Sequence, residues 1–143
     1  MEHVTLELDA AGTPIGSSFM WASPRDWARL GLLYLGNGVV GDRRILPEQW
    51  AEYSARPTPS ADRFGYGAGF WTNRSDGAGA RRRTDHGMPG DSYMARGTQG
   101  QYVVIVPSRR LVVVRMGYSA DPYGDVDAVS RLVGDVVAIL DRR

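Results

Sequence analysis

Two apolar segments near the end of the chain, separated by only four residues, constrain the fold most strongly. Residues 101–106 and 111–116 are rich in valine and other residues that favour extended strands. The intervening Pro107-Ser108-Arg109-Arg110 is typical of a tight turn. Strands joined this closely pair antiparallel, so the sequence predicts a β-hairpin. A further short strand is expected just before it, at residues 93–97.

An amphipathic helix is expected after the hairpin. Asp125 is predicted to cap its first turn, because an aspartate there can accept hydrogen bonds from free backbone amides. The apolar residues that follow recur at the spacing of one helix face: Val126, Val129, Val133, Val136, Val137 and Leu140. Such a face must be covered, and the hairpin offers an apolar sheet that would cover it. This part of the chain therefore predicts an α+β fold in which an antiparallel sheet packs against helices.

A second strong helix signal lies earlier in the sequence. Ser23 can cap the free amides of a first turn, and Pro24 fits the first helical position. The helix is expected to end at Leu35, because Gly36-Asn37-Gly38 follows. Its predicted buried stripe consists of Trp27, Leu30, Leu33 and Tyr34.

The remaining segments carry weaker patterns. Residues 1–15 are interpreted as an extended segment, and residues 46–55 as the region of a short helix. Residues 65–71 alternate glycine with larger residues, which predicts a strand approached closely by another backbone or a ligand. Residues 73–90 are rich in glycine and arginine and are expected to form an exposed loop, with Arg81-Arg82-Arg83 in solvent.

Charge and hydropathy exclude several kinds of partner. The 17 basic and 16 acidic residues give a formal net charge of +1, so no overall field attracts nucleic acid or anionic lipid. No apolar run approaches the roughly 20 residues that a membrane-spanning helix needs. The first residues lack the basic and apolar regions of a signal peptide, which leads us to expect a cytoplasmic protein.

Several common kinds of reactive site have no counterpart in the sequence. It contains no cysteine, and every basic residue is arginine, so a thiolate nucleophile and a Ser-x-x-Lys motif are both absent. His3 and His86 lack a second ligand at metal-binding spacing, so no metal or cofactor site is predicted. Gly90-Asp91-Ser92-Tyr93-Met94 begins like a Gly-x-Ser-x-Gly nucleophile elbow, but methionine replaces the second glycine.

Four stretches, taken in order, resemble one known family. Residues 16–29 end in an Asp-x-Ala-Arg helix start, and residues 41–48 form a turn that leads to Leu-Pro-Glu. Residues 64–67 with Trp71 give a Tyr-Gly-x-Gly and tryptophan segment, and residues 95–102 run into the apolar strands. Together they resemble the serine β-lactamase-like hydrolases, a group of β-lactamases, DD-peptidases and esterases, and within it the 6-aminohexanoate-dimer hydrolase branch. The resemblance covers nearly the whole chain.

The resemblance implies both a fold and a binding site. The implied fold is an antiparallel sheet covered by helices beside a mostly helical region, with the active site in the groove between them. The family's third motif, Lys-Thr-Gly or His-x-Gly, corresponds here to Thr98-Gln99-Gly100. The backbone N–H of Gln101 would then be one of two oxyanion-hole donors. Thr98 replaces a charged residue, so it can hydrogen-bond a substrate but cannot orient it by charge.

Trp71 is a further candidate for substrate binding. It follows the glycine-rich segment, and an aromatic side chain beside such a segment can line a pocket.

The resemblance also implies that the reacting groups lie outside this sequence. In the family the nucleophilic serine, its lysine and an activating tyrosine all precede the stretches matched here. We therefore expect residues 1–143 to be the C-terminal portion of a single domain, without its N-terminal catalytic part. The parent would cleave a small amide or ester by acyl transfer, and this chain alone would be inactive. It would also expose a sheet edge through which it could self-associate.

Two other functions stay open. The chain could be a non-catalytic remnant of the same fold that binds a small molecule or peptide. It could also be a β-rich interaction domain unrelated to the family, a reading that rests only on the general pattern of strands and a helix.

Overall fold

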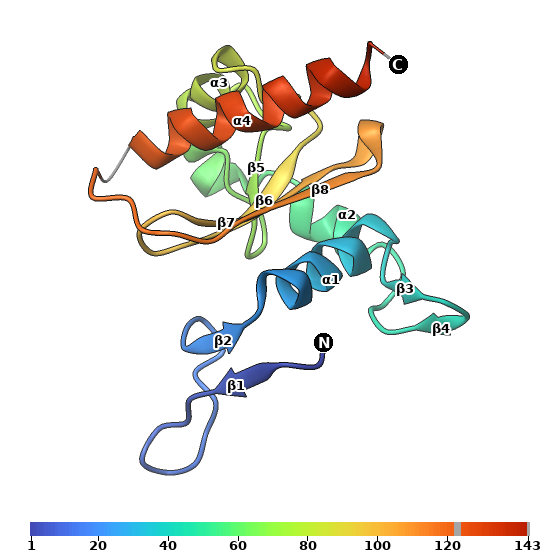
Figure 1. Ribbon diagram of the computed structural model, residues 1–143, viewed down its shortest axis with the longest axis vertical. Helices are drawn as coiled ribbons and strands as arrows, with labels where there is room; N and C mark the ends of the chain where they lie inside the picture. Colours follow the sequence, from blue (N-terminus) through green and yellow to red (C-terminus); the bar gives the residue numbers. More distant parts are fainter. Residues whose placement is uncertain (122–123, 143) are drawn as a thin grey trace.

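An antiparallel sheet of four strands, in the order β5-β6-β7-β8, organises the structure (Figure 1). The structure is a computed structural model, and it describes residues 1–121 and 124–142. The strands are β5 (Trp71–Thr72), β6 (Tyr93–Gly97), β7 (Gln101–Val106) and β8 (Leu111–Arg115). The predicted hairpin is confirmed, since β7 and β8 pair antiparallel across the short 3-10 turn η2 (Pro107–Arg109). The predicted strand at residues 93–97 is confirmed as β6.

Helices cover both faces of this sheet. Helix α4 (Gly124–Leu140) lies on one face, and helix α1 (Pro24–Leu35) lies on the other (Figure 1). A hydrophobic core lies on each face of the sheet. Alternate residues of β7 pack into one core or the other, because successive side chains of a strand point to opposite faces. Val104 packs with Val133 of α4, whereas Ile105 packs with Tyr34 of α1. The α+β fold, with an antiparallel sheet packed against helices, is confirmed.

Helix α1 has the predicted bounds. Ser23 is its N-cap, with Oγ accepting a hydrogen bond from the Asp26 amide at 3.2 Å, and Pro24 occupies the first turn. The predicted stripe is only half-buried: Trp27, Leu30, Leu33 and Tyr34. The helix instead makes its closest approach to the sheet at Gly31, which is buried. A Cβ at this position would lie 2.5 Å from Cγ1 of Val112, so any larger residue would force the side chain of Val112 to move.

The buried carboxylate of Asp26 ties the start of the chain to α1. It accepts hydrogen bonds from Ser23 Oγ at 2.8 Å and from the amides of Glu2 and His3 at 2.7 and 3.1 Å. Arg29 donates to the same carboxylate at 2.8 Å. These hydrogen bonds, with that of Ser23 the largest cause, hold the pKa of Asp26 well below its ordinary value.

Two small ribbons lie outside the main sheet. Strand β1 (Val4–Leu6) pairs with β2 (Met20–Ala22), and β3 (Val39–Val40) pairs with β4 (Arg43–Arg44). The extended segment predicted within residues 1–15 is thus confirmed as β1. The β1–β2 ribbon projects away from the body of the protein, and its apolar residues are exposed (Figure 1).

Between the ribbons and the sheet lie helix α2 (Trp50–Ala55) and the 3-10 helix η1 (Pro59–Phe64). The short helix predicted within residues 46–55 is confirmed as α2. The strand predicted at residues 65–71 is wrong except for Trp71, which begins β5. The chain turns at Gly65, whose φ is +63°, and Tyr66 meets Trp71 in a single antiparallel bridge.

The exposed loop predicted at residues 73–90 is also wrong. Residues 78–85 form helix α3 (Ala78–Asp85), and Arg83 in its interior is only 5% exposed. Backbone carbonyl groups of the surrounding turns accept its guanidinium hydrogen bonds, so the charge is satisfied inside the protein. A high content of arginine and glycine in a segment does not indicate which carbonyl groups will accept hydrogen bonds from a buried arginine.

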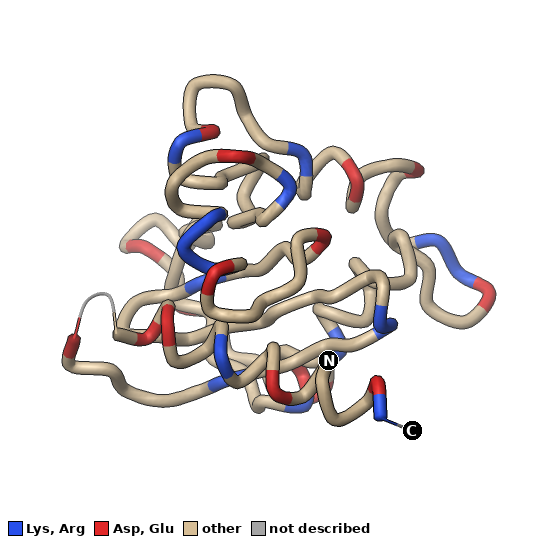
Figure 2. The backbone as a smooth tube through the Cα atoms, turned by 90° about the horizontal axis from the view of Figure 1, so that it is seen from above, with Lys and Arg blue, Asp and Glu red and all other residues tan. Residues whose placement is uncertain are grey.

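Charges of both signs are interspersed around the molecule (Figure 2). Within residues 1–121 and 124–142, no helix has the length and apolar character that a membrane span requires.

Ile105 provides a direct test of the core between the sheet and α1. Its side chain is fully buried, so the substitution Ile105→Ala leaves a cavity and is expected to lower the free energy of unfolding by about 3 kcal/mol. Urea unfolding followed by tryptophan fluorescence measures this change. Val40→Ala is the control, because Val40 is 56% exposed and should lose less than about 0.5 kcal/mol. Similar losses in the two variants would contradict this description of the core.

Candidate functional site

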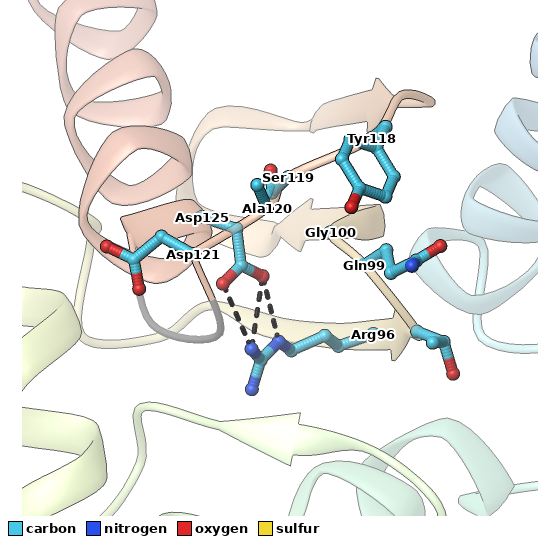
Figure 3. Close-up of a pocket in the computed structure, with 9 residues that line it drawn as sticks. Arg96, Gln99, Gly100, Tyr118, Ser119, Ala120, Asp121 and Asp125 are labelled. Carbon is cyan, nitrogen blue, oxygen red and sulfur yellow. Dashed lines mark hydrogen bonds and ion pairs between the residues drawn. The ribbon is translucent and has the colours of Figure 1, made fainter.

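Three of the four residues predicted to bind substrate lie together at one end of the sheet, and Trp71 is the exception. Thr98, Gln99 and Gly100 form the turn between β6 and β7, and Gln101 lies opposite Gly97 at the start of β7. This turn borders a hollow of about 290 Å³ (Figure 3). The lining residues are Arg96, Thr98, Gln99, Gly100, Tyr118, Ser119, Ala120, Asp121 and Asp125.

A buried carboxylate forms one wall of the hollow. Asp125 is 4% exposed and accepts hydrogen bonds from Arg96 Nε and Nη2 at 3.2 and 3.1 Å (Figure 3). The Tyr102 hydroxyl donates to the same carboxylate at 2.8 Å. The expected capping role of Asp125 is wrong: the residue lies inside the first turn of α4, and its side chain pairs with β6 and β7 instead.

The environment of Tyr102 keeps its hydroxyl available as a donor. Burial, followed by the hydrogen bond to Asp125, raises the pKa of Tyr102 well above its ordinary value. The hydroxyl therefore stays protonated through the physiological range and holds the Asp125 carboxylate in place.

Trp71 lies beside this cluster and does not line the hollow. The guanidinium carbons of Arg96 and Arg83 lie 5.8 and 5.9 Å from its ring centre, within cation–π range. Its ring also packs edge-on against Tyr66, with the centroids 5.0 Å apart. Trp71 thus supports Arg96, which does line the hollow, and direct contact of Trp71 with substrate stays a prediction.

Side chains from β7 and β8 hold the turn in place. The side-chain amide of Gln101 makes two hydrogen bonds with the backbone of Gly117. Its Nε2 donates to the Gly117 carbonyl at 2.6 Å, and its Oε1 accepts from the Gly117 N–H at 3.0 Å. Arg115 Nη1 donates to the carbonyls of Gly100 at 2.5 Å and Gly117 at 3.0 Å. Sequence reasoning missed Arg115 and the side-chain contacts of Gln101, because no local pattern signals a side chain that binds a distant backbone group.

Position 100 requires glycine, both for its backbone conformation and for lack of space around it. Its φ is +89°, and an added Cβ would collide with Arg115 Nη1 and lie 2.8 Å from Ser119 Oγ. We expect Gly100→Ala to displace the turn and lower the free energy of unfolding by about 2 kcal/mol. Urea unfolding and the amide NMR shifts of residues 96–101 measure both effects. Gly90→Ala, which meets no atom within 4 Å, is the control; equal effects would refute the requirement.

The polar groups of the hollow can form hydrogen bonds with a ligand. Three of its lining residues carry hydroxyl groups: Thr98, Tyr118 and Ser119. None of the other lining residues is a histidine that could act as their base. Ser92 is fully buried, and its Oγ has no hydrogen-bond partner among the residues that the structure describes, but it does not line the hollow. Across residues 1–121 and 124–142, no cluster of three histidine, cysteine or acidic side chains could hold a metal.

His86 lies away from the hollow. Its Nδ1 is 2.8 Å from the Arg82 carbonyl at the end of α3, and its Nε2 is 3.7 Å from Asp127 of α4. It thus links two helices.

Comparison with known proteins identifies the family. A solved structure from Bacillus anthracis, provisionally described as a 6-aminohexanoate-dimer hydrolase, matches with a TM-score of 0.70 and 21% sequence identity. The match covers 96% of this chain and 34% of that one, so the chain spans about a third of its length. No curated protein matches the chain significantly. The family model for β-lactamases matches residues 2–138. Because that match spans nearly the whole sequence, the chain belongs to the β-lactamase family of hydrolases.

Proposed function

We propose that this chain is the C-terminal portion of a serine hydrolase domain that cleaves a small amide or ester by acyl transfer. The match of the β-lactamase family to residues 2–138 carries the proposal. The chain contains no lysine, so the proposal requires the nucleophilic serine and its lysine to come from residues outside these 143. Coverage of only 34% of the Bacillus anthracis structure supports this division of the domain.

In this proposal the chain supplies one wall of the active site. The backbone N–H of Gln101 donates to the oxygen of the reacting carbonyl, where negative charge develops, and one such donor contributes about 3 kcal/mol to catalysis. Thr98, Gln99 and Gly100 border the hollow that receives the substrate. Arg96 is held by Asp125 and is flanked by Trp71, which fixes the position of its charge at the hollow.

An amide is the first substrate class to test. A 6-aminohexanoate dimer, the substrate in the name of the Bacillus anthracis relative, contains an amide bond. Thr98 in place of a charged motif residue favours recognition of the substrate by hydrogen bonding rather than by an ion pair at this position.

The coding sequence just upstream of Met1 tests whether the nucleophilic serine and its lysine precede these 143 residues. The proposal expects an in-frame Ser-x-x-Lys motif there, because acyl transfer needs both residues. Absence of any such motif would contradict the proposal and favour a second function, a binding module of the same fold. The observation that favours this alternative is the hollow itself, which offers hydrogen-bonding groups and has no histidine among its lining residues.

A further inference from the structure

An exposed tyrosine stands at the rim of the hollow. Tyr118 lies in the segment that joins β8 to α4, and its side chain is 70% exposed although it is one of the lining residues. In Figure 3 its hydroxyl end points toward the turn that carries Gln99 and Gly100. A tyrosine in such a place offers a ligand both an apolar ring face and a polar hydroxyl.

The backbone on each side of Tyr118 is fixed to that turn. The Ser119 N–H donates to the Gln99 carbonyl at 3.0 Å. The residue before the tyrosine, Gly117, is held by both hydrogen bonds of the Gln101 side chain, at 2.6 and 3.0 Å. The backbone therefore places the tyrosine beside the turn before a ligand binds, which reduces the entropy that binding would lose.

The charged groups of the hollow already have partners inside the protein. Arg96 and Asp125 pair with each other at 3.1 Å, and Asp121 also interacts with another group of the chain. Three hydroxyl groups, in contrast, make no hydrogen bond within the described part of the chain: those of Thr98, Tyr118 and Ser119. An uncharged ligand therefore fits the hollow better than an anion, which would lie near two carboxylates.

We propose that Tyr118 is a specificity-determining residue whose ring receives an uncharged aromatic arm of the substrate. The inference rests on the proposed function, which places the reacting carbonyl at Gln101, directly after the turn. Two aromatic rings in offset contact attract each other beyond the area that they bury, so an aromatic arm gains most from this ring. The hollow of about 290 Å³ is at the small end of ligand pockets, so it has room for one such arm.

NMR titration of the 143-residue chain with 3-phenylpropanamide tests the proposal. We expect saturable amide shifts confined to residues 96–101 and 117–121, together with ring-current shifts of the ligand's phenyl protons. Propanamide lacks only the ring and is expected to bind at least about tenfold more weakly, because the ring supplies the apolar contact. The anion 3-phenylpropanoate keeps the ring and should also bind more weakly, because its charge has no partner left in the hollow.

Variants at position 118 separate the ring from the hydroxyl. Tyr118→Ala is expected to weaken the binding of 3-phenylpropanamide about tenfold, whereas Tyr118→Phe keeps the ring and should retain the wild-type affinity. Tyr53→Ala is the matched control, because Tyr53 is 54% exposed on α2 and does not line the hollow. Circular dichroism checks that each variant is folded, as replacement of an exposed side chain should allow.

Several results would overturn the proposal. They are the absence of saturable shifts in the wild type, shifts that fall outside the hollow, equal affinity for propanamide, equal affinity in Tyr118→Ala, and lost affinity in Tyr118→Phe. The titration records binding and not turnover, so the proposed function is tested separately. Hydrolysis by a longer form without this binding would overturn the role of Tyr118 alone, and binding without hydrolysis would count against the proposed function alone.

Discussion

Replacing Arg83 with methionine is expected to lower the free energy of unfolding by about 3 kcal/mol, a large effect for a single substitution. The Arg83 side chain is 5% exposed and donates from Nε to Asn73 Oδ1 at 2.7 Å. Its Nη2 donates to the carbonyls of Thr72 at 2.7 Å and Gly65 at 3.2 Å. Methionine fills part of the space but removes all three of these hydrogen bonds. The Gly65 carbonyl keeps the Thr72 N–H as a donor at 2.8 Å, whereas a buried acceptor left unsatisfied, such as Asn73 Oδ1, costs about 1–3 kcal/mol.

The effect of Arg83→Met should not change with pH near neutrality. Burial lowers the pKa of Arg83 to about 10, and the nearby charge of Arg96 acts in the same direction. The folded pKa lies below the unfolded value of 12.5, so deprotonation would add stability only as the pH rises above about 10. At pH 7 the group is charged in both states, so the difference between the hydrogen bonds that it makes and the cost of burying its charge does not change with pH.

Urea unfolding of matched variants measures this prediction. Arg82→Met is the control, because Arg82 is the neighbouring residue, its side chain is 43% exposed, and its pair with Asp127 lies near the surface. An exposed ion pair contributes less than about 1 kcal/mol. Arg83→Lys should rescue only part of the loss, since an ammonium group cannot replace the planar donors of a guanidinium. Equal losses at positions 82 and 83 would contradict the role of Arg83.

The three consecutive arginines illustrate what the sequence could not predict. Their composition indicated a solvated loop, yet residues 78–85 form a helix in which Ala80 and Arg83 share the buried side. The hydrogen-bond partners of Arg83 lie 10 to 19 residues earlier in the chain, so no local pattern reveals them. The hairpin and α1 were predictable because their apolar spacing and capping residues act within a few positions of each other.

The candidate site, too, was predicted from the sequence only in part. The turn at residues 98–100 and the position of Gln101 came from a family resemblance. The structure places the turn beside one hollow and Gln101 directly after it, at the start of β7. The role of Asp125 was misjudged, because a carboxylate at the start of a helix is usually a cap. Here its partner Arg96 lies 29 residues away in sequence, and only the folded chain brings the two together.

A form of the protein extended upstream to the family's usual start is expected to hydrolyse activated esters, whereas the 143-residue chain is not. Loss of the nucleophile in a serine hydrolase costs on the order of a million-fold in turnover, so the difference should be very large. In the longer form, replacing the serine of the Ser-x-x-Lys motif with alanine should abolish the gain. This variant is the matched control, because it keeps the added length and the fold.

Parallel assays of the two forms with p-nitrophenyl acetate and nitrocefin test the central claim most directly. The account predicts turnover of at least one substrate by the longer form, sensitivity of that turnover to a serine-directed inhibitor, and no turnover by the 143-residue chain. A burst and inhibitor-sensitive turnover by the 143-residue chain itself would contradict the account, because the nucleophile would then lie within this sequence.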